Sequence, residues 1–372
     1  MLLSFATIAR NAKMKVFASA AILASLAVQA ATAGFVKTSG TAFELDGEPF
    51  YIFGTNSYWT SEINWSEADL TTIFKTMATN DLTVCRTEGF ADLTSVGTAP
   101  YNIVYQLWEN GTPTINTKEN GLGYFDKVVA AAKAAGVKLV VPLVNNWSDY
   151  GGMGKFRAIP TLMVPSRCPD HTLMQILATD VYVKQLGGKY HDEFYTNEKV
   201  KAAYKNYIAT FVKRYKYIKS LDSNHLVATG SEGFMNTNSS VYLYSGVSGV
   251  DFDANLAIDS IDYGAYHAYP DGWSVDPSEF VSWGEKWIND HVASGKKAGK
   301  PVVMEEYGVK THNATVYKAW SDAVYAAGSS MQYWELGIES LKTYKGDYTI
   351  YDTDDLFEST IVPAAKKFKA RS

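Results

Sequence analysis

Apolar runs and helical patterns alternate along most of the chain. Stretches with helical periodicity, such as Tyr124–Ala135 and Lys199–Arg214, lie between runs that have the composition of buried strands. This alternation is typical of βα units that build a parallel sheet. Ahead of it, Gly34–Phe50 has the pattern of a hairpin that turns at Asp46-Gly47. The seven strand candidates are Tyr51–Tyr58, Leu82–Gly89, Lys138–Asn145, His225–Glu232, Ser260–His267, Pro301–Gly308 and Ser330–Gly337.

Each strand candidate carries a polar or aromatic residue at or near its C-terminal end. In a (β/α)₈ barrel, side chains at these ends converge on one mouth, where active sites are built. Any single strand can end in a polar residue, but seven in succession with residue types used in catalysis favour a barrel. These residues are Asn56, Arg86, Asn145, Glu232, His267, Glu306 and Trp334.

The candidates number seven, whereas the barrel has eight strands. The third begins at residue 138 and the next only at residue 225, a wider spacing than between any other neighbours. This interval must hold a missing strand or foreign sequence. We therefore predict an α/β fold, a (β/α)₈ TIM barrel without a recognisable fourth strand.

Composition narrows the class of function. The chain has 372 residues, of which 47% are hydrophobic, enough for one barrel or two smaller domains. The formal net charge is −5 and there is no run of Lys or Arg, which argues against a nucleic-acid surface. Aromatic residues make up 14% of the chain. We expect most of them in the core and some as flat platforms in a sugar-binding cleft.

The N-terminus has the pattern of a secretory signal. Val16–Val28 is uncharged and follows two lysines, and Ala31-Thr32-Ala33 forms a small-residue cleavage site. We expect residues 1–33 to be the signal, which could also start at Met14 after an upstream extension, and residues 34–372 to be an extracellular barrel that is not bound to a membrane. Asn-x-Ser/Thr sequons suit this route and occur at Asn64, Asn110, Asn146, Asn238 and Asn313.

The strongest chemical motif is Pro301–Gly308, a buried strand that ends in two carboxylates, an aromatic residue and a glycine. A barrel glycosidase needs a carboxylate fixed at a strand end to act as nucleophile. Because side chains alternate along a strand, we expect only one of Glu305 and Glu306 to point into the mouth. The structural alternative is a pair of carboxylates that faces the surface.

Three other strand ends can support such a carboxylate. His267 and Tyr269 can hold it by hydrogen bonds, although a single histidine is more often structural. Arg86 can pair with it. Trp334, at the end of the last strand, suits stacking on the apolar face of a sugar.

Other chemistries find no support in the sequence. The six histidines form no H-E-x-x-H or similar metal pattern, and there is no Walker loop, dinucleotide fingerprint or G-x-S-x-G elbow. Cys85 and Cys168 are too few for a disulfide scaffold, and the sequence leaves their pairing open. We expect neither a metal nor a cofactor.

Taken together, several motifs resemble the secreted fungal endo-β-1,4-mannanases of glycoside hydrolase family 5. The resemblance runs from about Gly34 to the C-terminus, with two breaks. It implies retaining cleavage of mannan, galactomannan or glucomannan; we expect a monomer. The motifs that carry it are Gly54–Trp59, Asn145–Gly152, Gly187–Tyr195, His267–Asp271 and Glu305–Gly308.

The resemblance also implies roles for individual residues. Glu306, directly before Tyr-Gly, corresponds to the nucleophile, and Arg86, His267 and Tyr269 to the groups that support it. Position 88 is Glu where the family has an aromatic residue, which puts one sugar contact in doubt. The residues that correspond to the sugar path are Trp334, Trp147, Asn56 and Trp59.

The first break removes the general acid/base. In the family the fourth strand ends in Asn-Glu-Pro, whose Glu has this role, and the chain contains no Asn-Glu-Pro. Instead Tyr215-Lys216 runs directly into Tyr217–Asp222, which resembles the end of the following helix. Glu232 and Glu335 also lie at strand ends, but an acid/base must sit about 5 to 5.5 Å from the nucleophile, which few positions satisfy.

The second break is an insertion, Gly154–Asp180, which has no periodicity. Possible codons for its two ends contain the sequences of an intron donor and an intron acceptor. We therefore interpret the insertion as a retained intron. We interpret the missing strand as coding sequence that was removed in error as if it were an intron. The alternatives are a genuine loop and deletion, or a functional lid. The chain as written would then be an impaired mannanase, a non-catalytic mannan-binding protein, or a chain that does not fold.

Overall fold

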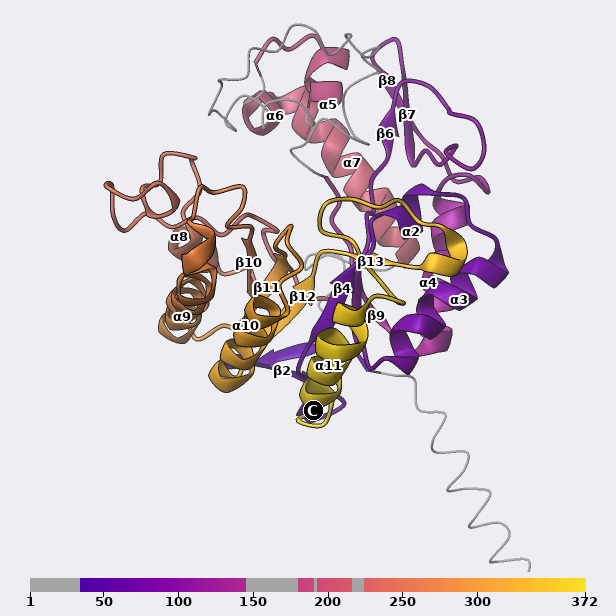
Figure 1. Cartoon of the computed structure of the whole chain (residues 1–372). Helices are drawn as coiled ribbons and strands as arrows, with labels where there is room; N and C mark the ends of the chain where they lie inside the picture. Colours follow the sequence, from indigo (N-terminus) through magenta and orange to yellow (C-terminus); the bar gives the residue numbers. More distant parts are fainter. Residues whose placement is uncertain (1–33, 145–179, 191–192, 216–223) are drawn as a thin grey trace, which may run out of the picture. The chain divides into compact units, whose positions relative to one another are not determined.

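The computed structural model describes residues 34–144, 180–190, 193–215 and 224–372 (Figure 1). The chain divides into two compact units, Met1–Phe35 and Val36–Ser372, and the following account concerns the second. Three predicted features lie outside the described residues: the signal at 1–33, the insertion at 154–180 except for its last residue, Asp180, and the junction at 216–222.

A six-stranded parallel sheet forms the centre of the unit, in the order β10-β11-β12-β4-β5-β9. It curls as part of a barrel, and the last strand of the sheet in the chain, β12, pairs with the first, β4, through Met331↔Phe53 and Tyr333↔Thr55. The strands are β4 (Phe53–Asn56), β5 (Val84–Arg86), β9 (Lys138–Val140), β10 (Gly264–Ala268), β11 (Val302–Tyr307) and β12 (Ser330–Tyr333).

Helices cover the outer face of this sheet (Figure 1). In the contacts, α9 lies against β10 and β11, α10 against β12, α11 against β4 and α4 against β9. The helices are α2 (Trp59–Glu62), α3 (Glu67–Thr79), α4 (Leu122–Ala135), α5 (Asp180–Gln185), α6 (Glu193–Thr196), α7 (Glu198–Tyr215), α8 (Phe252–Leu256), α9 (Phe280–Ala298), α10 (Ala314–Ala327) and α11 (Val362–Lys369), with a π-helical turn at Phe357–Ile361. None of the helices in the described ranges is long and apolar enough to cross a bilayer.

Six of the seven predicted strands are confirmed, and the two predicted helices are α4 and α7. The prediction for His225–Glu232 is wrong, because this segment is not a strand. It touches the β10 region through two separated backbone hydrogen bonds, Asp262 N to Val227 O at 2.8 Å and His267 N to Glu232 O at 3.2 Å. Gly230, with φ of +61°, interrupts the extended backbone between them. Among the described residues, β9 and β10 are therefore the two edges of the sheet.

A small antiparallel sheet closes the inner face at the amino ends of the strands. Asp46 and Gly47, with φ of 57° and 91°, form its predicted turn, between Leu45 and Glu48. Positive φ at both positions is the geometry of a type I′ hairpin turn. Its strands are β1 (Lys37–Ser39), β2 (Ala42–Leu45) and β3 (Glu48–Pro49), and its apolar contacts join Phe43, Phe50, Ile52, Val84, Tyr263, Ala265 and Val303. The opposite end of the barrel, at the carboxyl ends of the strands, is therefore its mouth.

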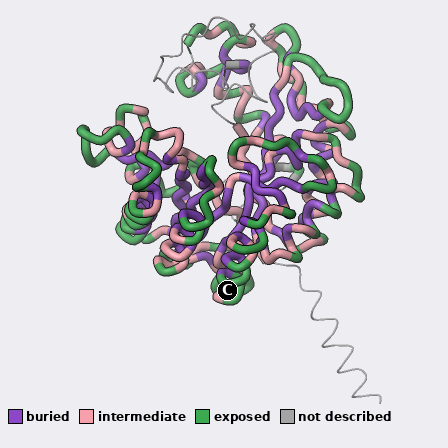
Figure 2. The backbone as a smooth tube through the Cα atoms, viewed as in Figure 1, coloured by how far each residue is buried: buried purple, intermediate pink, exposed green. Residues whose placement is uncertain are grey.

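The core between sheet and helices is rich in aromatic rings, and Figure 2 shows it as a buried interior. Trp320 of α10 lies against α9, where its indole N–H donates to Phe280 O at 3.0 Å. Gly284 makes this approach possible, because a Cβ there would lie 2.0 Å from Trp320 Nε1. The remaining strands lie in connecting segments: β6 (Asp92–Leu93), β7 (Gln106–Glu109), β8 (Thr112–Ile115), β13 (Leu336–Gly337) and β14 (Ile350–Tyr351).

Candidate active site

Two adjacent carboxylates, Glu305 and Glu306, lie at the end of β11, and both face the same neighbours. The register between β10 and β11 shifts so that Tyr266 pairs with Met304 and His267 with Glu306, which leaves Glu305 as an extra residue. A β-bulge of this kind breaks side-chain alternation. The expectation that only one of the two carboxylates points inward is therefore wrong: both reach Arg86 and His267.

Arg86, from the end of β5, is the cation of the site. Its Nη1 donates to Glu306 Oε1 at 2.6 Å, and its Nε lies 3.5 Å from Glu305 Oε2. Nη1 also donates to Asn56 Oδ1 at 3.1 Å, while Asn56 Nδ2 donates to the carbonyls of Glu305 and Tyr333 at 2.9 and 3.1 Å. Asn56 thus ties β4, β11 and β12 together and fixes the guanidinium. The predicted pairing of Arg86 with a carboxylate is confirmed.

His267 and Tyr269, at the end of β10, hold the other side of Glu306. Tyr269 OH donates to Glu306 Oε2 at 2.8 Å, and His267 Nδ1 lies 3.5 Å from the same oxygen. Glu232 Oε2 is also 3.5 Å from His267 Nδ1. The Glu306 carboxylate is therefore fixed at both oxygens, by a guanidinium on one and a phenol on the other.

The charges of these groups follow from their partners. Burial lowers the pKa of His267, but Glu306, Glu232 and Glu305 outweigh it and raise the pKa to about 10, so the imidazole is a cation at neutral pH. Burial raises the pKa of Glu305, but Arg86 and His267 bring it below its ordinary value. Burial and then Glu306 raise the pKa of Tyr269, so the phenol keeps its proton and donates it.

Half-buried aromatic rings flank the carboxylates. Trp334, which follows β12, stacks on Tyr58 with ring centroids 5.8 Å apart and planes at 9°. Tyr269 contacts the rings of Tyr348 and Trp273, at 5.2 and 6.3 Å. Flat, partly open rings beside a carboxylate match what a sugar ring needs, because its C–H face packs on aromatic surfaces.

Two of the residues expected along the sugar path are buried instead. Trp59 is 1% exposed, its indole N–H donates to Leu336 O at 3.1 Å, and its ring packs edge-on against Trp65. Asn56 is also 1% exposed, and both ends of its amide are engaged within the protein. Neither side chain has a free face for a sugar in this structure. Trp147 lies outside the described residues.

Two further buried carboxyls, Glu88 and Glu335, interact with the charge of Glu306, and the sequence motifs assigned no role to them. Burial raises the pKa of Glu88 to about 7 and that of Glu335 to about 8. In each case the negative charge of Glu306 contributes to this rise. Glu335 accepts a hydrogen bond from Thr349 Oγ1 at 3.0 Å. Both positions stand out in the sequence, Glu88 as a departure from the family and Glu335 as a carboxylate at a strand end, but neither signal reveals that they are buried.

These buried groups make the stability depend on pH. Glu88, Glu335 and Asp92, whose pKa burial raises to about 7, are protonated more readily in the folded chain than in the unfolded one. The stability they contribute is complete below the ordinary carboxyl pKa and is lost as pH rises toward about 8. His267 acts in the same direction between its ordinary pKa of 6.5 and about 10.

The melting temperature should therefore be higher at about pH 5 than at about pH 8. Thermal unfolding followed by circular dichroism at the two pH values checks this. A Glu88→Gln/Glu335→Gln double variant, which cannot ionise at these positions, should show a smaller difference. Equal melting temperatures in the wild-type chain would contradict the assignment of neutral buried carboxyls.

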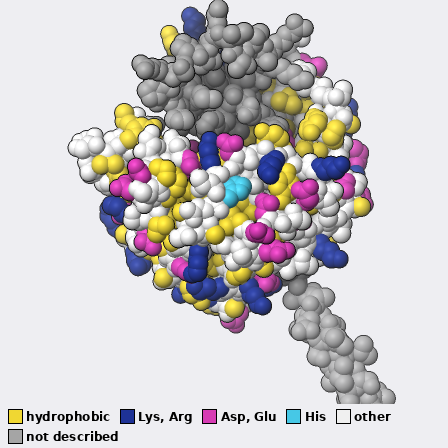
Figure 3. All heavy atoms as spheres, viewed as in Figure 1, with side chains coloured by type: hydrophobic (Ala, Val, Ile, Leu, Met, Phe, Trp, Pro, Cys, Tyr) yellow, Lys and Arg dark blue, Asp and Glu magenta, His cyan; other side chains and the backbone are white. Residues whose placement is uncertain are grey.

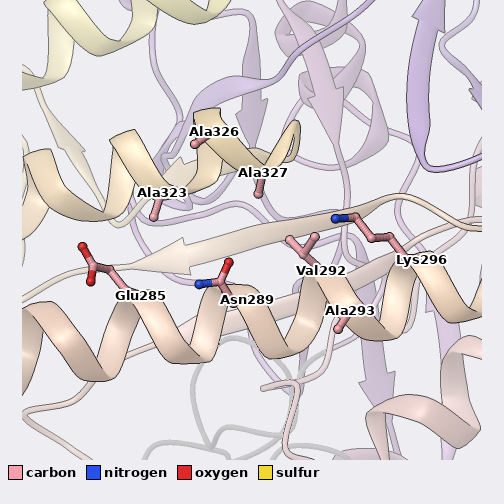
Figure 4. A pocket seen from close by; sticks show the side chains of 8 residues that line it. All are labelled: Glu285, Asn289, Val292, Ala293, Lys296, Ala323, Ala326 and Ala327. Carbon is pink, nitrogen blue, oxygen red and sulfur yellow. The ribbon is translucent and has the colours of Figure 1, made fainter.

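The rest of the described surface has no second cluster comparable to the one around Glu305 and Glu306. No group of three or more His, Cys, Asp or Glu in the described ranges could hold a metal. On the face in Figure 3, acidic and basic side chains lie interspersed. A depression between α9 and α10 is lined mainly by small and aliphatic side chains and shares no residue with the mouth (Figure 4). Cys85 is buried and free, and Cys168 lies outside the described residues.

Comparison with known proteins gives consistent matches. The family described as "GH family 5 beta-mannosidase-like" matches residues 33–217 and 213–349. A probable mannan endo-1,4-β-mannosidase C of Aspergillus terreus is 33% identical over 90% of this chain and 92% of its own length. Mannan endo-1,4-β-mannosidase A of Aspergillus aculeatus is 37% identical over 83% of each chain.

A solved structure is also similar to this chain. The endo-1,4-β-mannanase from Rhizomucor miehei superposes with a TM-score of 0.75 and 30% identity, over 91% of this chain and 100% of that one. The predicted (β/α)₈ barrel class is thereby confirmed.

Proposed function

Because the chain belongs to the β-mannosidase-like group of glycoside hydrolase family 5, we propose that its barrel serves the endo-hydrolysis of β-1,4-mannosidic bonds in mannan, galactomannan and glucomannan. The observation that carries the proposal is the Glu306 carboxylate at the end of β11, fixed by Arg86 at 2.6 Å and Tyr269 at 2.8 Å. The solved relatives named as mannanases support the choice of substrate.

Glu306 would act as the nucleophile of a retaining reaction. Its carboxylate attacks the anomeric carbon, the bond to the leaving sugar breaks, and a covalent glycosyl-enzyme forms that water then hydrolyses. Arg86 orients the carboxylate through one oxygen, and Tyr269 holds the second oxygen. Trp334 and Tyr58 would carry the sugar beside the cleavage point, and Trp147 would extend this path.

Leaving-group departure needs a second carboxyl. A general acid protonates the leaving oxygen and contributes about 10² to 10⁴ in rate. The family supplies it from Asn-Glu-Pro, which this sequence lacks. We propose that residues 154–180 are a retained intron, that the coding sequence of the acid/base strand is missing near residue 216, and that hydrolysis by the chain as written is impaired or absent.

The missing acid/base also favours a second candidate function. A chain that keeps the aromatic mouth and Glu306 but cannot protonate the leaving group would bind mannan without cutting it. We further propose that the protein is secreted, with residues 1–33 as the signal and residues 34–372 as the barrel, and that it is a monomer. The sequons at Asn64 and Asn238 and the apolar stretch Val16–Val28 support secretion.

The decisive experiment compares the chain as written with the form encoded by the native transcript. We expect the written chain to bind insoluble mannan and to release reducing ends at least about 10²-fold more slowly than a form that contains Asn-Glu-Pro. Loss of viscosity of galactomannan and reducing-end assays measure the two activities. A transcript identical to the written chain would support the binding protein, whereas rapid hydrolysis by the written chain would refute the loss of acid/base function.

A further inference from the structure

The segment after β5 presents a second carboxyl on the inner face of the sheet. Thr87 N donates to Val140 O at 3.0 Å and Gly89 N to Pro142 O at 2.8 Å, so the extended pairing with the β9 segment continues past Arg86. In such a strand, side chains two residues apart lie on the same face. Glu88 therefore shares the face of Arg86.

The side chain between them confirms this orientation. Thr87 Oγ1 donates to Ser57 O at 3.1 Å and lies 2.9 Å from Ser61 Oγ, on the side where α2 begins. Arg86 faces the opposite way, toward Glu305 and Glu306. Glu88 therefore lies on the same face as Arg86, two residues further along the chain and nearer to the opening of the mouth.

Glu88 is buried without being satisfied. It is 8% exposed, and within the described residues its Oε2 has no hydrogen-bond partner. An unpartnered buried carboxyl oxygen destabilises the folded chain, so the fold gains nothing locally from a polar group here. The charges that act on it come from the site itself: Arg86 lowers its pKa, and Glu306 and Glu305 raise it.

In the described part of the segment after β5, the Glu88 carboxyl keeps an acceptor oxygen that no protein group uses. Arg86 already divides its donors between Glu306 and Asn56. A sugar unit that lies over Glu306 presents vicinal hydroxyls, each of which can donate a hydrogen bond. An enclosed carboxyl oxygen without a partner is well suited to accept one, because the bond then satisfies a group that is otherwise desolvated.

We propose that Glu88 is a substrate-contacting residue, which accepts a hydrogen bond from a hydroxyl of the sugar unit held beside Glu306. The inference rests on the proposed function, since it takes a β-mannan chain as the occupant of the mouth. The role of Glu88 is in affinity: it binds the sugar and takes no part in forming or breaking the glycosidic bond.

The test measures binding of mannohexaose by calorimetry in a Glu306→Gln background, in which the ligand stays intact. Adding Glu88→Ala should weaken binding about 10-fold, because the sugar hydroxyl loses its acceptor in an enclosed site. Glu88→Gln, which keeps an acceptor oxygen in the same place, should stay within a few-fold of the background. Glu88→Asp moves the carboxyl back by one methylene and should weaken binding while preserving the chemical group.

Glu62→Gln is the matched control. Glu62, on α2, is also a buried carboxyl with an unpartnered oxygen, and it interacts with Glu88 and Asp92. It lies on α2, on the side of the segment to which Thr87 and not Glu88 points, so its replacement should leave mannohexaose binding unchanged.

The outcomes separate the two proposals. If the Glu306→Gln chain binds mannohexaose and both Glu88→Ala and Glu88→Asp bind it equally well, the contact does not exist. If Glu88→Ala fails to fold, Glu88→Asp alone decides between contact and no contact. If the Glu306→Gln chain itself shows no binding, the proposed function fails, and the Glu88 contact fails with it.

Discussion

Replacement of Glu306 by Gln should abolish turnover while leaving affinity for mannan nearly intact. The amide has the shape of the carboxylate and can still accept from Tyr269, whose hydroxyl lies 2.8 Å from Oε2. It cannot form the glycosyl-enzyme, because an amide is a poor nucleophile. Loss of an essential nucleophile lowers kcat by factors on the order of 10⁴ to 10⁶.

The measurement requires the transcript-encoded form with its acid/base. Initial rates on galactomannan and calorimetric binding of mannohexaose should separate, with the rate lost and the affinity kept. Glu285→Gln, an exposed glutamate on α9, is the control and should change neither. Loss of binding together with activity would refute the assignment of Glu306 as the nucleophile, because it would indicate a structural role.

Replacement of Arg86 by Met should destabilise the fold strongly, by about 3 to 5 kcal/mol at neutral pH, the range seen when one partner of a buried ion pair is removed. Arg86 is 8% exposed and is the guanidinium to which both Glu305 and Glu306 are paired. Without it, His267 is the cation that remains beside the two buried carboxylates among the described residues. Urea unfolding at pH 7 should show a lower midpoint with an unchanged slope.

The effect of Arg86→Met should shrink in acid. Arg86 and His267 hold the pKa of Glu305 below its ordinary value, so the stability from this pairing is present above the ordinary carboxyl pKa. It is lost as pH falls through the lowered pKa of the folded chain. Wild type and variant should therefore converge at low pH, and Arg86→Met/Glu305→Gln should recover part of the loss at pH 7. A constant difference at all pH values would indicate a packing effect.

The sequence predicted the elements whose signal is local. Buried strands between helical patterns marked β4, β5, β9, β10, β11 and β12, and polar residues at strand ends marked Arg86, His267 and Glu306. The rule that side chains alternate, applied to Glu305 and Glu306, failed because it assumes regular pairing. The bulge between β10 and β11 is a property of two strands together, and neither strand alone encodes it visibly.

The burial of individual side chains could not be predicted from the sequence either. Trp59 and Trp334 are both tryptophans next to strand ends, yet one is 1% exposed and the other is half-buried in a stack on Tyr58. The raised pKa of Glu335 likewise depends on enclosure by residues distant in the chain. His225–Glu232 has a strand composition, but Gly230 and the side chain of Asp262, which accepts from Val227 N at 2.7 Å, replace a regular ladder.

The pairing of β12 with β4 has a consequence for synthesis on the ribosome. Met331 lies beside Phe53, and Ile52 N donates to Ser330 Oγ across 278 positions of the chain. While the nascent chain emerges, β4, β5 and β9 can assemble against their helices, but β4 keeps a bare edge until nearly the whole polypeptide has left the exit tunnel. Contacts of such long sequence separation form late and slowly. We therefore expect the emerging chain to depend on chaperones that shield the edge of β4 until β12 arrives.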